Sequence, residues 1–425
     1  MSAVAIIVAL LAALFAGIPV AFALGGLGML LLFLGGFSSL MTPAALLSTI
    51  DSFVLIAVPL FLLMSNILLK GGVGRDLFAA VQAWVGHWPG GMAVATIFSC
   101  GLFAAISGSS VATAATIATV AIPEMTARGY PRPFVLGLLA AGGTLGILIP
   151  PSIPMIIFGV ITEESIISLF LAGIGPGLLM IGLFVGYSML YARFSPRCEA
   201  SPRADWATRM RTTRRALPTA ILAAFIVIGL YGGVFTPTEA AAVGFIGALV
   251  VTGIILRTLD WEKLKAATRE AMMTTIAILL IVAGASVFGK AITLYRIPQE
   301  ISVFIADNIQ SGALFVIAIS GVLLIMGLVL EALSMMLIMV PVLAGSLTTL
   351  GIDVVWFGVF FVIMVECALI TPPVGLNLYV IQAVGKARMS EVAGGVWPFI
   401  VLMLGTVAAI YLMPDLALYI PFKMP

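Results

Sequence analysis

Long apolar segments alternate with short polar, mostly basic segments along the chain. A helix rises about 1.5 Å per residue, so about 20 apolar residues cross the hydrocarbon core of a bilayer. The pattern therefore predicts ten membrane-spanning helices. They lie at roughly residues 3–17, 19–38, 52–70, 134–161, 165–192, 218–235, 238–257, 274–292, 354–384 and 390–412.

Two further apolar segments, residues 91–123 and 313–346, each have a polar or glycine-rich point near the middle. In the first it is Ser107-Gly108-Ser109-Ser110, and in the second it runs from Gly327 to Glu331. Each arm has about 15 residues, or about 22 Å, which is too short to cross. We therefore expect a re-entrant helical hairpin in each segment rather than two spans.

Two of the predicted spans contain a proline pair. Pro150-Pro151 lies in 134–161, and Pro372-Pro373 lies in 354–384. Proline removes a backbone donor and clashes with the preceding turn, so each pair breaks its helix. Broken helices are tolerated in hydrocarbon only where they line a cavity or are buried in protein. Matched breaks in two halves of a membrane protein indicate the binding site of a transporter.

Basic residues orient the predicted helices through the positive-inside rule. With the arginine-rich loop 193–215 in the cytoplasm, 17 of the 20 basic residues fall on the cytoplasmic side. Lys290 lies near a helix end, and Arg296 and Lys423 lie outside. The first hairpin then opens to the cytoplasm and the second to the outside, and both chain termini are periplasmic.

The two halves show the same order of elements. Residues 1–194 form a first repeat and residues 218–425 a second, joined by a basic cytoplasmic linker at 195–217. Each has three spans, an amphipathic arm (73–88 and 294–310), a hairpin, a broken helix and a final span. Because the first half starts outside and the second inside, this order predicts an inverted repeat. The alternative is a chance likeness between apolar helices.

Composition excludes several classes of protein. The chain is 62% hydrophobic and 9% charged, with a mean hydropathy of +1.24, as expected of an all-α polytopic protein of the lipid bilayer. A single histidine, no metal-ligand spacing among the cysteines and no nucleophile–base pair argue against an enzyme. No nucleic-acid partner is expected. The apolar N-terminal segment is too long for a signal peptide and has no preceding basic residue.

Candidate chemistry lies at the hairpin tips and the helix breaks. The hydroxyls and freed carbonyls around Ser107–Ser110 suit a small cation such as Na⁺, although small serines also allow close helix packing. Glu331 is a carboxylate in an apolar hairpin, which predicts a functional role facing a cavity. Glu366 either has a functional role or forms a structural hydrogen bond between helices. Thr371 and Asn377 are candidates for satisfying the broken backbone or coordinating an ion. Thr238 is the expected cap of a helix with Glu239 in its first turn.

These motifs resemble the large membrane subunit (DctM type) of tripartite ATP-independent periplasmic (TRAP) transporters. Five segments carry the resemblance in order along the chain. They are Pro59-Leu60-Phe61 before Gly71-Gly72, Phe103–Ser110, Gly142–Pro154, Gly233–Ala242 and Thr371–Asn377.

The resemblance implies an elevator fold of the ion-transporter superfamily and uptake coupled to Na⁺, with two or more ions. One Na⁺ site would use Ser107, Ser109, Gly146 and Ile149, and the other Gly327, Ala368, Thr371 and Val374. Ser109, Ser152 and Glu331 would approach the substrate. The family often has glycine where Ala368 stands, and some relatives have aspartate where Glu331 stands.

The resemblance also implies partners and a location in the bacterial inner membrane. The partners are a small four-helix membrane subunit (Q type) and a periplasmic substrate-binding protein (P type). Because the chain begins directly at the first repeat, we expect both as separate chains. Expected substrates are organic acids such as dicarboxylates and sugar acids, or zwitterions. A stand-alone Na⁺- or H⁺-coupled anion transporter of the same superfamily remains the alternative.

Overall fold

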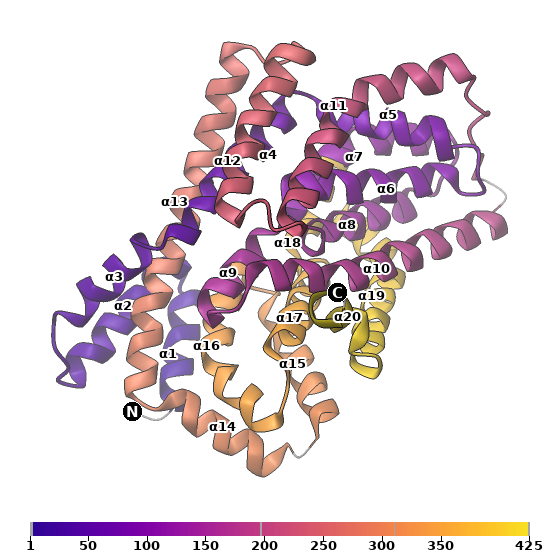
Figure 1. The fold of residues 1–425 in the computed structure, drawn as a ribbon. Coiled ribbons are helices and arrows are strands. Elements are labelled where there is room, and N and C mark those ends of the chain that lie inside the picture. The colour runs from indigo at the N-terminus through magenta and orange to yellow at the C-terminus, as the bar shows by residue number, and fades with distance from the viewer. Residues whose placement is uncertain (1–2, 196–197, 310, 424–425) are drawn as a thin grey trace.

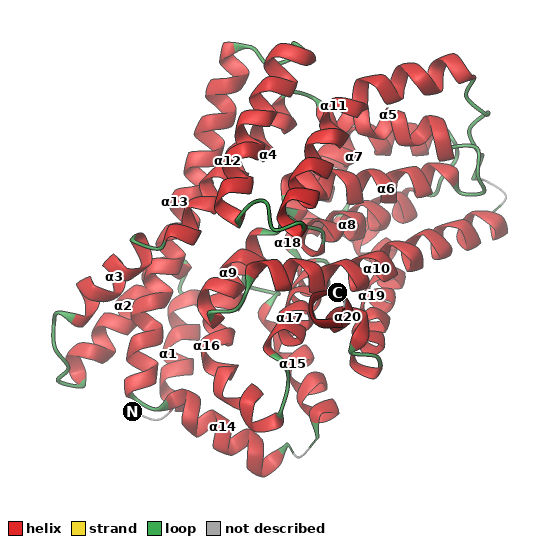
Figure 2. Ribbon diagram, in the orientation of Figure 1, coloured by secondary structure: helices red, strands yellow, loops and turns green. Residues whose placement is uncertain are grey.

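The computed structural model describes residues 3–195, 198–309 and 311–423 of the 425-residue chain. Within these residues the regular structure is entirely helical, and Figure 2 shows helices joined by short loops. The helices of the first half are α1 (Ala3–Phe15), α2 (Val20–Leu34), α3 (Met41–Ile50), η1 (Phe53–Ile56), α4 (Ala57–Lys70), α5 (Val73–Val85), α6 (Gly91–Ser107), α7 (Ser110–Ala127), α8 (Arg132–Leu148), α9 (Ile153–Thr162) and α10 (Ile166–Phe194).

The second half contains the remaining elements. They are α11 (Trp206–Tyr231), α12 (Pro237–Leu249), η2 (Val250–Ile255), α13 (Trp261–Leu294), α14 (Ile297–Asn308), α15 (Gly312–Met326), α16 (Ala332–Leu350), α17 (Val354–Leu369), α18 (Leu376–Gly385), α19 (Met389–Leu412) and α20 (Asp415–Lys423).

One group of helices consists of α1–α4, α12 and α13 and is called the scaffold group below. In it α2, α3 and α4 pack on the long helix α13, α1 packs on α2, and α12 packs on α4. Figure 1 shows α4, α12 and α13 side by side, with α1–α3 at the other end of α13. Small residues allow α2 and α13 to approach closely. A Cβ placed on Gly28 would lie 2.8 Å from the backbone nitrogen of Phe288. Such contacts favour helix association where lipid provides no hydrophobic driving force.

A second group, α5–α10 and α14–α20, contains both predicted hairpins and both proline pairs, and is called the hairpin group. Its helices contact one another in a reciprocal pattern. The second hairpin arm α7 packs on α8 and on α18, while the corresponding arm α16 packs on α17 and on α9. Each hairpin therefore contacts the helix before its own break and the helix after the other break.

The predicted spans are partly wrong in length. Among the described residues, seven helices are long and apolar enough to cross a membrane, or eight if the bent pair α8–α9 is one span. The ten predicted spans included 3–17, 19–38 and 354–384, but these segments hold the shorter helices α1, α2, α17 and α18. Hydropathy marks where apolar segments lie, whereas turns at Gly17 and Gly35 and the break after Leu369 shorten the helices.

The predicted length of the hairpin arms is also wrong for α16. Helix α16 has 19 residues and is long enough to cross a membrane, whereas α15, the other arm of the same hairpin, has 15. Two helices, α3 and α20, were not predicted at all, because neither segment stands out as a separate apolar span.

The predicted linker 195–217 is wrong in its second part, because α11 begins at Trp206. This arginine-rich end of α11 packs on α5. The Trp84 Nε1–H donates to Thr213 Oγ1 at 2.9 Å, and the Arg209 guanidinium lies 5.3 Å from the Trp84 ring centre. Arg215 pairs with Asp76 at 2.9 Å. Tertiary contacts thus extend the helix beyond its apolar part.

The expected cap Thr238 is also corrected by the structure. Helix α12 begins two residues earlier than a Thr238 cap would place it, with Pro237 as its first residue and Thr236 as the cap. Thr236 and Glu239 form a reciprocal capping box, in which the Glu239 carboxylate accepts the Thr236 N–H at 2.9 Å.

Candidate functional site

The tip of the first hairpin forms a compact hydroxyl cluster. Ser107 ends α6, and Gly108, with φ +58°, turns the chain so that Ser109 caps α7 by accepting the Ala112 N–H at 3.4 Å. The Ser107 hydroxyl lies 2.7 Å from the Thr113 hydroxyl, and both residues are buried. Three oxygen-bearing side chains therefore meet where α6 and α7 join.

The first helix break packs directly against this tip. Helices α8 and α9 meet at a bend of 43° across Pro150-Pro151. A Cβ placed on Gly108 would lie 2.7 Å from the Pro151 carbonyl oxygen. One placed on Gly146 would lie 3.2 Å from both the Ser109 carbonyl oxygen and the Thr113 hydroxyl. The structure thus brings Ser107, Ser109 and Gly146 together. Ile149, the C-terminal cap of α8, follows one turn later.

Each proline pair frees backbone carbonyls at an equivalent place. In a helix the carbonyl of residue i accepts the N–H of residue i+4, and proline has none. The Gly146 and Ile147 carbonyls therefore lose their helical partners at Pro150 and Pro151. Ala368 lies four residues before Pro372 in the same way, and its carbonyl accepts the Thr371 N–H at 3.1 Å instead. Freed carbonyls are the hard oxygen ligands that small cations prefer.

The tip of the second hairpin meets the second break through Gly327. This residue ends α15, and a Cβ placed on it would contact the Cβ of Ala368. The Thr371 hydroxyl donates to the Cys367 carbonyl at 2.7 Å, which leaves its oxygen free as an acceptor. Val374 lies beyond the break with 37% of its surface exposed. Within the described part of the chain, no hydrogen bond joins it to Gly327, Ala368 or Thr371.

The three predicted substrate contacts lie in different surroundings. Ser109 is half-buried, whereas Ser152 is fully buried and caps α9 by accepting the Met155 N–H at 3.4 Å. Glu331 occupies the exposed N-terminal cap position of α16, with the Ser334 hydroxyl 3.5 Å from its carboxylate. In the described residues no hydrogen bond links these three side chains.

Four helix N-termini belong to the tips and breaks. Helices α7, α9, α16 and α18 begin after Ser109, Ser152, Glu331 and Gly375. Free backbone N–H groups and the helix dipole make such N-termini favourable for anions. The arrangement therefore offers oxygen ligands for cations and helix N-termini for an anionic group.

For four further polar residues at the tips and breaks, the role or the partner was missed or left undecided by the sequence. Thr113 lies four residues after Ser109, so the helical period was the signal that could have found it. Ser110 lies beside the carboxyl group of Glu366, although outside the geometry of a hydrogen bond. Glu366 and Asn377 are fully buried, and their side-chain oxygen and nitrogen atoms have no hydrogen-bond partner.

Two cavities lie between the scaffold group and the hairpin group. One, of about 470 Å³, is lined by α3, α9, α13 and α16, with Ser48, Ser286 and Glu163 among its polar residues. The other, of about 400 Å³, is lined by the α4–α5 turn, α7, Arg215 and Lys263. In this second cavity burial raises the pKa of Asp76, and the Arg215 guanidinium opposes that rise.

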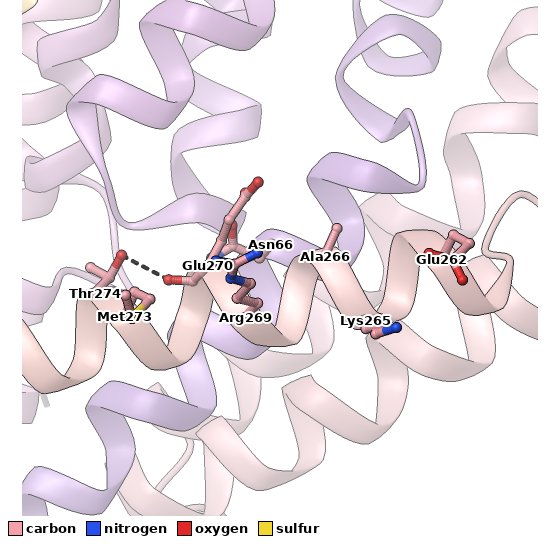
Figure 3. Close-up of a pocket in the computed structure, with 8 residues that line it drawn as sticks. All are labelled: Asn66, Glu262, Lys265, Ala266, Arg269, Glu270, Met273 and Thr274. Atoms are coloured by element: carbon pink, nitrogen blue, oxygen red, sulfur yellow. Dashed lines mark hydrogen bonds between the residues drawn. The ribbon is translucent and has the colours of Figure 1, made fainter.

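A third cavity, of about 840 Å³, lies on the polar end of the scaffold group (Figure 3). It is lined by Asn66 of α4 and by charged residues of α13, including Lys265, Arg269 and Glu270. The close-up shows Lys265 and Glu262 directed away from Asn66 and Glu270. This cavity contains none of the predicted site residues.

Comparison with known proteins identifies the family. The family described as tripartite ATP-independent periplasmic transporter, DctM component, matches residues 7–416. The chain belongs to the DctM family. This DctM component is therefore a multi-pass membrane protein and a permease subunit of a transporter, not an enzyme.

Among curated relatives, this DctM component is 36% identical to the C4-dicarboxylate TRAP transporter large permease protein DctM of Pseudomonas aeruginosa. The similarity covers 88% of each chain. It is 37% identical to the ectoine/5-hydroxyectoine TRAP transporter large permease protein UehC of Ruegeria pomeroyi, over 86% of this chain and 85% of that one. The fold resembles the YdaH transporter of Alcanivorax borkumensis, with a TM-score of 0.62, 14% identity, and 89% and 88% of the two chains covered.

Proposed function

We propose that this DctM component is the large permease of a Na⁺-coupled transporter that takes up an organic acid or related zwitterion. The observation that carries the proposal is the pairing of each hairpin tip with a proline-broken helix. Ser107, Ser109 and Gly146 meet at one pair, and Gly327 and Ala368 meet at the other. Both pairs combine hydroxyls or freed carbonyls in an apolar interior, which suits a dehydrated monovalent cation.

The reciprocal packing supports an inverted repeat and an elevator movement. Helix α7 contacts α18 as α16 contacts α9, which is the relation that a two-fold axis in the membrane plane would produce. Cavities of about 470 and 400 Å³ lie between the hairpin group and the scaffold group. In the proposed mechanism the hairpin group moves as a body past α4 and α13 and carries the substrate with it.

The proposed substrate is a small solute with a carboxylate. Helix N-termini at both breaks and both hairpin tips would hold that carboxylate. Glu331 at the second tip would then meet a hydroxyl or ammonium group of the substrate. Two of the relatives are named for a C4-dicarboxylate and for the zwitterion ectoine, and these two solutes share a carboxylate.

The proposed partners follow from the tripartite description of the family. They are a periplasmic binding protein that delivers the substrate and a small membrane subunit of the Q type. The proposed setting is the bacterial inner membrane, with the basic segments in the cytoplasm and both termini in the periplasm.

Reconstitution tests this proposal. The chain is placed in proteoliposomes with and without the small subunit and the binding protein encoded nearest to it, and uptake of that binding protein's ligand is measured. Uptake only with all three components is the expected result. Equal uptake by this chain alone would instead establish a stand-alone transporter of the same superfamily.

A further inference from the structure

Glu366 is a fully buried carboxyl group that the proposed transport site does not yet use. It lies on α17, one turn before the helix ends, and none of its surface is exposed. Neither carboxyl oxygen has a hydrogen-bond partner, and it takes part in no ion pair among the described residues. A buried, unpaired carboxylate is costly, so such a group is either protonated or held beside a positive charge.

The position of Glu366 connects the two candidate cation sites. Along α17 it lies two residues before Ala368, whose Cβ packs against the tip residue Gly327. Across the interface its carboxyl group lies beside the hydroxyl of Ser110, the residue that follows Ser109 in the first tip. Glu366 therefore has a chain neighbour, Ala368, in the second tip–break pair and a spatial neighbour, Ser110, at the first tip.

The candidate cation ligands themselves carry no charge. Hydroxyls and backbone carbonyls make up both sets, and the other nearby carboxylate, Glu331, is exposed at the second tip. Charges interact strongly over several ångströms in an interior of low dielectric constant. A carboxylate near these neutral ligands therefore stabilises a bound cation without coordinating it directly.

We propose that Glu366 is the shared counter-charge of the two cation sites, a positioning residue through which occupation of one site affects the other. This inference rests on the proposed Na⁺ coupling. Ser110 lies beside the carboxyl group on the side of the first hairpin. Replacement of Glu366 by a neutral side chain of the same shape then weakens Na⁺ binding at both sites while leaving the oxygen ligands in place.

The experiment compares the wild-type chain with Glu366→Gln and Glu366→Asp. Two readouts are taken on the purified complex: thermal stabilisation by NaCl against choline chloride, and the Na⁺ concentration for half-maximal uptake in proteoliposomes. In Glu366→Gln we expect the half-maximal Na⁺ concentration to rise about tenfold or more and the Na⁺-dependent stabilisation to fall. Glu366→Asp, which keeps the charge, restores most of both.

Cys367→Ala provides the matched control, because Cys367 is the next residue of α17, is fully buried and is uncharged. It keeps wild-type Na⁺ dependence. An unchanged Na⁺ response in a folded Glu366→Gln protein overturns the inference while the proposed function stands. A wild-type protein with no Na⁺ stabilisation and no Na⁺-dependent uptake refutes the proposed function itself.

Discussion

Buried hydroxyls in the first hairpin differ in where their hydrogen-bond partners lie. Ser99 donates to the Ala95 carbonyl one turn back in α6, at 2.6 Å, as an ordinary helical serine does. Ser107 instead meets Thr113 at 2.7 Å and lies beside Ser109 at the junction of two helices. The same residue type is thus bonded within its own helix at one position and across a helix junction at the other.

Ser107→Ala is predicted to raise the Na⁺ requirement for uptake. Loss of one ligand oxygen costs about 1–3 kcal/mol of binding free energy, so the half-maximal Na⁺ concentration rises about five- to hundredfold. Ser99→Ala on the same helix serves as control, with an unchanged requirement. Uptake kinetics as a function of Na⁺ concentration measure both, and equal values for the two variants would remove Ser107 from the site.

For single residues, the sequence shows which polar side chains are candidates better than it shows which other residues they contact. The serines of the first tip and Thr371, just before the second proline pair, could be recognised as candidates because they interrupt apolar segments. The relation between Ser107 and Thr113 depends on how α6 and α7 fold back on each other. The relation between Ser110 and Glu366 joins residues far apart in the chain, and no local pattern encodes it.

The helices of the hairpin group are set by prolines and glycines. Proline pairs end α8 and α17, and the residues after them start α9 and α18 in new directions. Gly327 allows α15 to contact Ala368 at the second break. These breaks could be predicted because proline acts locally, whereas α3, α20 and the early start of α11 depend on tertiary contacts and were missed.

Gly327→Ala is predicted to impair uptake and lower thermal stability, because its new methyl group would overlap the side chain of Ala368. Overpacking of this kind costs about 1–3 kcal/mol, a fall of about 2–10 °C in the unfolding temperature. Gly321→Ala on the same helix is the matched control, since a Cβ there meets nothing within 4 Å. Thermal unfolding of the purified protein distinguishes them, and an unaltered Gly327→Ala protein would contradict the docking of this tip.

For the whole molecule, basic residues interact with distant parts of the chain. Lys70 pairs with Glu270 at 2.6 Å, Arg215 with Asp76 at 2.9 Å, and Arg132 donates to the Gly385 carbonyl at 2.6 Å. The positive-inside rule predicts that all three basic residues lie on the cytoplasmic side. The reciprocal packing of the two hairpins could not be predicted in detail from hydropathy.

The proposed orientation predicts which loops react from outside the cell. In a chain with Cys198 replaced by serine, Val234→Cys, where the native valine is 69% exposed, should react with a membrane-impermeant maleimide on intact cells. Ala200→Cys, in the basic linker, should react only after permeabilisation. The reverse pattern of labelling would invert the proposed topology.

Dependence of uptake on a Na⁺ gradient tests the central claim most directly. Proteoliposomes that contain the permease, its small subunit and its binding protein are supplied with labelled substrate, with Na⁺ outside only, at equal concentration on both sides, or replaced by choline. The account predicts concentrative uptake with the inward gradient alone, and its loss in the other two conditions. Concentrative uptake that is unchanged without a Na⁺ gradient would contradict it.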